Sequence, residues 1–136
     1  MIKRVLVGTD TSASADLAVS HAAELARSYG AELTVVYVRA FDDGRDVVDP
    51  RVAADPDGYL KGLSTRLGGL PVRTRRERGD PAQTICRVAE EERTDVIVVG
   101  NRGTHGRRRS FVQSVPANVA RHSPCSVLIV DTRVAQ

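Results

Sequence analysis

Apolar residues along the chain follow two alternating patterns. Short apolar runs predict buried strands at residues 2–8, 33–38, 95–100 and 125–130. Between them, apolar residues recur every three or four positions, which predicts helices at residues 12–29, 57–67, 81–92 and 114–122. Residues 71–78 alternate in period but carry charge on both faces, which is typical of an edge strand. The polar, aspartate-rich residues 39–56 predict a long loop.

Local signals mark the helix ends. Thr11 and Ser12 can cap the first helix and Gly30 can end it. Asp80 and Pro81 form a cap followed by a proline at the first helical position. Gly62 is expected to break the second helix. Strands that alternate with helices predict parallel strands joined by right-handed crossovers, so we expect one doubly wound α/β domain over residues 1–136, with helices on both faces.

Composition excludes several classes of protein. With 41% hydrophobic and 27% charged residues, the chain resembles ordinary soluble domains. No apolar run approaches the ~20 residues that span a bilayer, and residues 2–8 predict a strand and no signal peptide. Cys86 and Cys125 give neither a disulfide framework nor metal-ligand spacing, so we expect a reduced, cytoplasmic compartment with both thiols packed as small hydrophobes.

Positive charge is concentrated in one segment. The net charge is +3, and four arginines and His105 lie within residues 102–109. Arginine suits phosphate because its planar guanidinium presents a fork of donors, although a solvated loop is an equally good interpretation of the charge alone. Nucleic acid is not expected, because the chain has no Trp and only 4% aromatic residues to interleave with the arginines.

Candidate chemistry lies where the predicted strands end. In an open parallel sheet, ligands bind outside the carboxyl ends of the strands. Gly8, Thr9 and Asp10 end the first strand, Val38 ends the second, and residues 100–103 (Gly-Asn-Arg-Gly) end the fourth. Glycines allow close approach of a ligand, and a helix that begins nearby directs free N–H groups toward an anion. The alternative is that Gly100 and Gly103 only turn the chain.

One spacing within this segment identifies a family resemblance. Gly100, two residues, Gly103, nine residues and then Ser114 resemble the nucleotide-binding motif of the universal stress protein family, although Gln113 stands where that motif has its third glycine. Three further segments also resemble the family, so that the similarity extends along essentially the whole chain: residues 5–12, 79–81 and 122–130.

The resemblance implies an adenine nucleotide alpha-hydrolase-like fold with strand order 3-2-1-4-5, and a role in stress response or signalling. It also implies that ATP or another adenine nucleotide (AMP or cyclic AMP), with or without Mg²⁺, binds between the first and fourth strands. The implied nucleotide-binding residues are Gly8, Thr9, Asp10, Val38, Gly100, Arg102, Gly103, Gln113, Ser114 and Val115.

The resemblance also implies which part of the nucleotide each residue would contact. Thr9 and Asp10 would hold adenine and ribose, while the Val38 backbone would pair with the adenine edge. Gly100, Arg102 and Gly103 would line the ribose and phosphate turn, and the amides of residues 113–115 would cap the phosphates. Two of these residues have a structural alternative, because Asp10 and Ser114 could each simply cap a helix.

Gln113 is the departure from the family pattern that matters most. A side chain at this position could crowd the phosphates and alter nucleotide preference, or it could donate a hydrogen bond to them. Three functions therefore stay open: a nucleotide-binding stress protein, a non-nucleotide dimeric partner-binding protein, and a slow nucleotide hydrolase. No catalytic residues are identified, since no paired carboxylates obviously face the phosphates as base or metal ligands.

The last predicted strand, from Cys125 to Val130, is apolar on both faces. A bare edge of this kind would be an aggregation hazard. We therefore expect a two-fold homodimer that pairs the last strands, which the family resemblance also implies.

Overall fold

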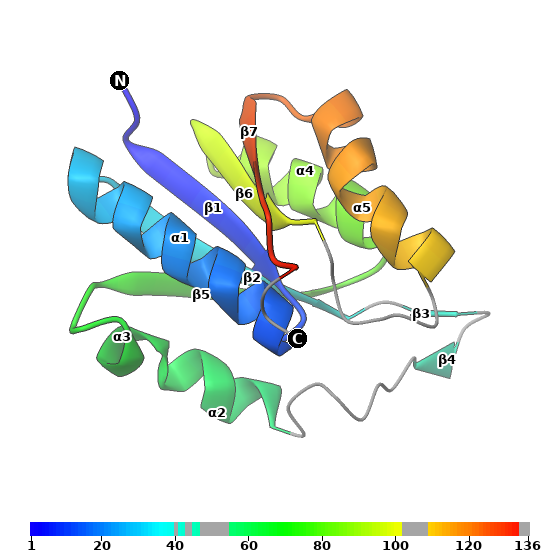
Figure 1. Ribbon diagram of the computed structural model, residues 1–136, viewed down its shortest axis with the longest axis horizontal. Coiled ribbons are helices and arrows are strands. Elements are labelled where there is room, and N and C mark those ends of the chain that lie inside the picture. The colour runs from blue at the N-terminus through cyan, green and yellow to red at the C-terminus, as the bar shows by residue number, and fades with distance from the viewer. Residues whose placement is uncertain (40, 43–44, 47–54, 102–108, 134–136) are drawn as a thin grey trace.

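Five parallel strands form the central sheet. The computed structural model describes residues 1–39, 41–42, 45–46, 55–101 and 109–133. The strands are β1 (Arg4–Thr9), β2 (Glu32–Arg39), β5 (Val72–Arg78), β6 (Val96–Gly100) and β7 (Ser126–Val130). They lie in the order β5-β2-β1-β6-β7 (Figure 1), and every neighbouring pair is parallel. The predicted order 3-2-1-4-5 is confirmed.

Helices cover both faces of this sheet, as Figure 1 shows. One face carries α1 (Ala13–Tyr29), α2 (Pro56–Lys61) and α3 (Leu63–Arg66), and the other carries α4 (Pro81–Glu91) and α5 (Arg109–His122). Alternate residues of β1 therefore enter two different cores: Val5 and Val7 pack toward α1, while Leu6 packs toward α4. Burial on both faces explains why the inner strands are continuous apolar runs. In the part of the chain that is described, no helix is long and apolar enough to cross a membrane.

The predicted helix signals are confirmed. Of the two candidate caps, Ser12 and not Thr11 caps α1, by accepting a hydrogen bond from the N–H of Ala15, and Gly30 ends the helix in the left-handed conformation with φ 64°. The Asp80 carboxylate accepts from the N–H of Gln83 at the start of α4. The second predicted helix is broken at Gly62 into α2 and α3. These signals act within a few residues, which is why the sequence displays them.

Both cysteines are half-buried thiols without a disulfide. Cys86 and Cys125 pack against the core between the sheet and the α4–α5 face, as expected for small hydrophobes. Burial raises the pKa of both thiols.

The prediction of a long polar loop at residues 39–56 is wrong in part. Two short strands, β3 (Phe41–Asp42) and β4 (Arg45–Asp46), form an antiparallel pair within it. The dipeptide Asp43-Gly44 stands between them in the sequence, and Asp-Gly is favoured in two-residue hairpin turns. The prediction missed this strand pair because the many aspartates of the segment favour a loop.

The predicted start of the last helix is also wrong. Helix α5 begins at Arg109 and not at Ser114, so it carries Pro116 in its interior. Phe111, Val115 and Val119 follow one another at intervals of four, and this apolar period extends the helix past the serine. Ser114 is therefore not a helix cap. The backbone N–H groups of residues 113–115 lie within the helix and not at its free N-terminus.

Candidate functional site

The carboxyl ends of β2, β1 and β6 meet at one edge of the sheet, because these strands are neighbours and parallel. Thr9, the last residue of β1, is buried with 6% of its surface exposed. Asp10 follows it and is half-buried. The structure thus brings together the ends of the strands from which the candidate residues come.

The turn from β1 to α1 is held by its own side chains. Thr9 Oγ1 accepts a hydrogen bond from the N–H of Thr11 (2.9 Å), and Asp10 Oδ1 accepts one from the N–H of Ser12 (2.9 Å). Thr11 needs such support, since its φ of 71° is in the left-handed region that non-glycine residues seldom adopt. The helix cap is Ser12, so Asp10 does not serve as the α1 cap. Asp10 instead fixes the turn through one oxygen, and its other oxygen can accept a further bond.

The register of β2 directs its last backbone groups toward this turn. The final pair between β1 and β2 joins Thr9 to Tyr37, so Val38 lies one residue beyond the end of the ladder. The carbonyl of Arg39 accepts from the N–H of Gly79, on the β5 side. Because successive peptide groups of a strand point to opposite edges, the N–H and C=O of Val38 point to the β1 side. A planar ligand above Thr9 could pair with this edge.

The glycines at the strand ends have a packing role. A Cβ on Gly8 would lie 2.7 Å from Cδ1 of Ile85, and one on Gly100 would lie 2.9 Å from Cγ2 of Thr132. Neighbouring side chains thus already fill the space that a larger residue would need at both positions. These contacts give a structural reason for glycine at positions 8 and 100, independent of any ligand.

The end of β6 is tied to the segment that follows β7. Asn101 Oδ1 accepts from the N–H of Thr132 (3.0 Å) and from its hydroxyl (3.3 Å). The N–H of Asn101 donates to the carbonyl of Val130 (3.0 Å). The Asn101 side chain therefore supports the chain beside the site, a role that its position in the glycine motif did not reveal.

The remaining predicted residues are only partly described. Arg102 and Gly103 lie outside the described residues. Gln113 and Ser114 lie in the backbone of α5, and their side chains are outside the described part. Val115 is half-buried and packs against the core on the α4–α5 face. The described part of the site is therefore the side that would hold a base and a sugar.

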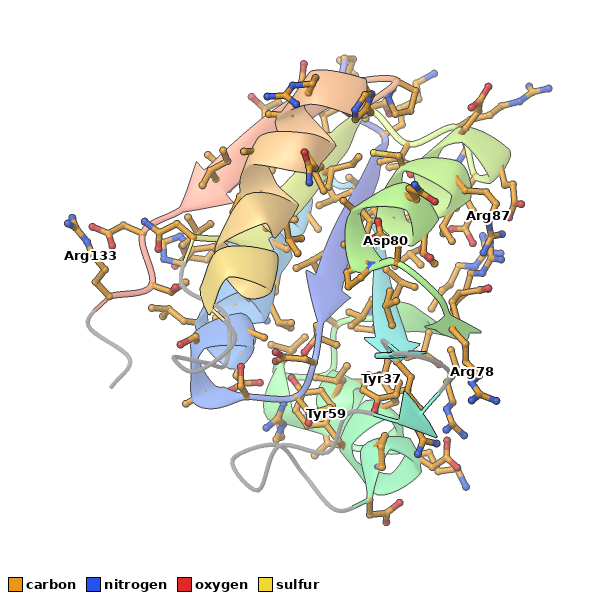
Figure 2. All side chains as sticks on the ribbon, turned by 90° about the vertical axis from the view of Figure 1, so that its right-hand side faces the viewer. Tyr37, Tyr59, Arg78, Asp80, Arg87 and Arg133 are labelled. Atoms are coloured by element: carbon orange, nitrogen blue, oxygen red, sulfur yellow. The ribbon has the colours of Figure 1, made fainter. Side chains whose placement is uncertain are left out.

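A polar cluster that the sequence did not predict joins α1 to α2 and α3. We call it the Tyr59 cluster: Tyr59, Asp16 and Arg66. Tyr59 Oη donates to Asp16 Oδ1 (2.6 Å), and Arg66 Nη2 donates to the same oxygen (2.8 Å). The Arg66 guanidinium also lies over the Tyr59 ring, 4.7 Å from its centroid. Figure 2 shows Tyr59, a residue of α2, beyond the carboxyl end of the sheet.

The surroundings of Tyr59 change its acidity. Burial, followed by the hydrogen bond to Asp16 and the charge of that carboxylate, raises the pKa of Tyr59 to about 12. Hydrogen bonds with Thr9 and Arg66 act in the opposite direction. Tyr59 therefore carries a neutral hydroxyl at physiological pH, and that hydroxyl is hydrogen-bonded to Asp16.

The donor set suits a nucleoside more clearly than a metal ion. Among the residues that are described, no group of three or more His, Cys, Asp or Glu side chains could hold a metal. A carboxylate with a spare oxygen, a threonine hydroxyl and a directed backbone edge match ribose hydroxyls and a base edge.

A protein-family model matches this chain over nearly its whole length. The model described as the universal stress protein family covers residues 1–131. A protein of Staphylococcus haemolyticus named as a universal stress protein is 33% identical over 141 residues, which cover 96% of this chain and 85% of the relative.

Solved structures of the same family are similar in fold. The universal stress protein UspA from Lactobacillus plantarum superposes with a TM-score of 0.79 at 26% identity, covering 95% of this chain and 97% of that one. A universal stress protein solved in complex with cAMP gives a TM-score of 0.71 at 28% identity, covering 96% of this chain and 98% of that one.

Proposed function

This chain belongs to the universal stress protein family, and from that premise we propose that it binds an adenine nucleotide at the carboxyl ends of β1 and β6. The observation that carries the proposal is the arrangement around Asp10. One carboxylate oxygen is fixed by the N–H of Ser12, and the backbone edge of Val38 points toward the same place beyond the last β1–β2 pair. A relative with the same fold binds cAMP.

The nucleoside occupies the part of the site built by β1 and β2. Asp10 accepts hydrogen bonds from ribose hydroxyls, Thr9 contacts the base and sugar, and the backbone of Val38 pairs with the adenine edge. Gly8 and Gly100 keep the strand ends close-packed beneath the ligand.

The phosphates extend toward α5. Arg102 supplies positive charge, Gly103 lets the backbone approach, and residues 113–115 contact the phosphates from the helix, with Ser114 able to donate through its hydroxyl. Because α5 begins at Arg109, the free N–H groups of its first turn precede Gln113. Mg²⁺, when present, accompanies the phosphates of ATP. The bound nucleotide then biases the conformation or partners of the protein in stress signalling.

Calorimetry with ATP, AMP and cyclic AMP tests this function. We expect the wild type to bind at least one of the three, and Asp10→Ala to weaken that binding about ten-fold or more by removing a charged acceptor. Glu24→Ala is the matched control, since Glu24 is an exposed carboxylate on α1. If the wild type binds none of the three nucleotides, the proposal fails and a partner-binding stress protein becomes the better account.

Gln113→Gly separates the two roles of the unusual glutamine. If the side chain crowds the phosphates, the glycine variant binds more tightly, and ATP gains more than AMP. If the glutamine amide donates to a phosphate oxygen, the variant binds more weakly, by about 1–3 kcal/mol. We expect the first outcome, with a wild type that prefers a compact nucleotide such as a monophosphate. Calorimetry well below the unfolding temperature checks it, because glycine within α5 also costs helix stability.

The apolar edge of the sheet supports a second, compatible function. Leu128 and Ile129 of β7 are 41% and 45% exposed. We propose that two copies pair through this strand, from Cys125 to Val130, and that the homodimer is the form that meets partner proteins.

A further inference from the structure

The ladder between β1 and β6 ends before either strand does. Its last pair joins Val7 to Val98, whereas β1 continues to Thr9 and β6 to Gly100. Beyond that pair, the described ladders join each strand to its outer neighbour: β1 to β2 through Thr9, and β6 to β7 through Gly100. The winding of the sheet reverses between β1 and β6 (Figure 1), which is where an open parallel sheet binds its ligand. The β6 side of the proposed site is therefore supported from β7.

The segment after β7 extends this support past the end of β6. The N–H of Asn101 donates to the carbonyl of Val130 (3.0 Å), and Asn101 Oδ1 accepts from both the N–H (3.0 Å) and the hydroxyl (3.3 Å) of Thr132. In a continued parallel ladder, the N–H of Thr132 would be donated to the backbone carbonyl of Asn101. The Asn101 side chain takes that place, so its hydrogen bonds end the β6–β7 ladder and fix residue 101 to residues 130–132.

Thr132 also packs against the first glycine of the motif. A Cβ on Gly100 would lie 2.9 Å from Cγ2 of Thr132. Thr132 is fully buried, whereas the Asp131 and Arg133 side chains beside it are exposed. Arg133 donates to Asp131 from its N–H (3.1 Å) and from Nη2 (2.6 Å), which closes a local turn with Thr132 facing the core. The threonine thus lies against Gly100 with its methyl group and binds Asn101 with its polar atoms.

The strand register places Asn101 level with the proposed ribose acceptor. Val7 pairs with Val98, and Asp10 and Asn101 each follow three residues later along these parallel strands. Asp10 is fixed within its own turn, by the bond from the N–H of Ser12. Asn101 is fixed by residues 130–132, which come from a distant part of the sequence. A ligand that spans the two strand ends therefore meets one local support and one supplied by the segment after β7.

We propose that Thr132 is a positioning residue for the nucleotide site: through the Asn101 side chain, it holds the start of the glycine motif at the level of Asp10. This inference rests on the proposed adenine-nucleotide function. A ligand that contacts both β1 and β6 binds best when both strand ends are already fixed, because any freedom lost on binding lowers affinity.

Thr132→Val tests the inference because it removes the hydroxyl and keeps the shape that packs against Gly100. We expect affinity for AMP, ATP or cyclic AMP, measured by calorimetry, to fall about three- to ten-fold. Thr132→Ser retains the hydroxyl and should bind within about two-fold of the wild type. Thr94→Val is the matched control, because Thr94 is a buried threonine before the amino end of β6. This control should leave affinity unchanged even if it lowers the free energy of unfolding.

A double-mutant cycle separates positioning from an independent contact. Asn101→Ala removes the acceptor of both Thr132 bonds, so we expect a loss of about ten-fold in affinity. If Thr132 acts through Asn101, the double variant Asn101→Ala/Thr132→Val binds no more weakly than Asn101→Ala alone. Losses that multiply, or wild-type affinity in Thr132→Val, overturn the inference while the proposed function stands. A wild type that binds none of the three nucleotides overturns both.

Hydrogen exchange in the ligand-free protein gives a readout that does not depend on binding. The N–H of Asn101, which donates to Val130, should exchange faster in Thr132→Val and at the wild-type rate in Thr94→Val. If Thr132→Val does not fold, Asn101→Ala should lower affinity and accelerate exchange of the Thr132 amide, whose acceptor it removes. Unchanged exchange in the folded variant contradicts a positioning role.

Discussion

The two edges of the sheet present opposite surfaces. At one edge, β5 reads Val-Arg-Thr-Arg-Arg-Glu-Arg, and at the other, β7 reads Ser-Val-Leu-Ile-Val. Both strands have one side without a neighbouring strand in the described sheet, and such a side can template pairing with another chain. Charge opposes that pairing at β5, whereas nothing in the composition of β7 opposes it. The difference indicates which edge is available for assembly.

The charge of β5 is organised into an ion-pair network. The guanidinium of Arg75 lies 2.7 Å from Glu77 and 3.1 Å from both Glu91 and Glu92 of the α4 end, and Glu77 also pairs with Arg87 at 2.9 Å. Arg75 is only 27% exposed, so these pairs are partly shielded from water. The network therefore fastens β5 to α4 as well as guarding the edge.

The apolar side chains of β7 are exposed on neighbouring positions. Leu128 and Ile129 are 41% and 45% exposed, while Val130 is buried against the core. Successive residues of a strand point to opposite faces, so both faces of this edge offer apolar surface. A second β7 placed alongside by a two-fold axis would cover it.

A charge placed on β7 should produce the largest effect. We expect the double variant Leu128→Asp/Ile129→Asp to convert the proposed dimer into a monomer, with association weakened at least about 100-fold, because like charges would face one another across the proposed two-fold axis. Sedimentation velocity at micromolar concentration measures it. The control Thr74→Asp adds a carboxylate to β5 and should leave the oligomeric state unchanged. A wild type that is already monomeric contradicts the assignment of this edge.

Removal of the central arginine of β5 should produce the next largest effect. Arg75→Met leaves the carboxylates of Glu77, Glu91 and Glu92 without their shared cation, and we expect a loss of about 2–3 kcal/mol in the free energy of unfolding. Urea denaturation at neutral pH measures the loss. Arg73→Met is the matched control, because Arg73 is 67% exposed and 4.0 Å from Glu32. Equal losses in the two variants would contradict the network.

Low pH should reduce the stabilisation that the ion-pair network of β5 contributes to the folded protein. Hydrogen bonds from Arg87 and then Arg75 hold the pKa of Glu77 below its ordinary value of 4.5. The unfolded chain therefore takes up the proton first as the pH falls, and the stabilisation that is present above about pH 4.5 is lost below it. Urea denaturation between pH 7 and pH 3 should show a smaller decline in Glu77→Gln than in the wild type. Parallel declines would assign the acid sensitivity to other groups.

Most of the fold follows from signals that act over a few residues. The caps at Ser12 and Asp80, the break at Gly62 and the charged edge at β5 are each visible in the sequence, and each is confirmed. The start of α5 was not predicted correctly, because two local signals disagree there. Ser114 is a favoured N-cap residue, whereas the helical spacing of apolar residues continues on both sides of it. The short strand pair β3–β4 within residues 39–56 was not predicted for a similar reason. The polar composition favoured a loop, and only one dipeptide indicated a hairpin turn.

The candidate site was only partly predictable. Thr9, Asp10 and Val38 stand at strand ends, so topology brings them together as expected. The sequence gives no indication of the Tyr59 cluster, because Tyr59 and Asp16 are 43 positions apart and meet only when α2 docks beside α1. Contacts of this kind depend on tertiary packing and leave no local period.

The smallest expected effect tests whether one charge or the whole row protects β5. Arg73→Val removes an exposed arginine that lies 4.0 Å from the Glu32 carboxylate, so we expect the free energy of unfolding to change by less than about 0.5 kcal/mol. Arg75, Arg76, Glu77 and Arg78 still place charge along the strand, and the oligomeric state should stay that of the wild type. Sedimentation at low and high salt checks this, because salt screens exposed charges. New association of Arg73→Val at low salt would mean that this single charge guards the edge, and the contrast with β7 would then depend on one residue.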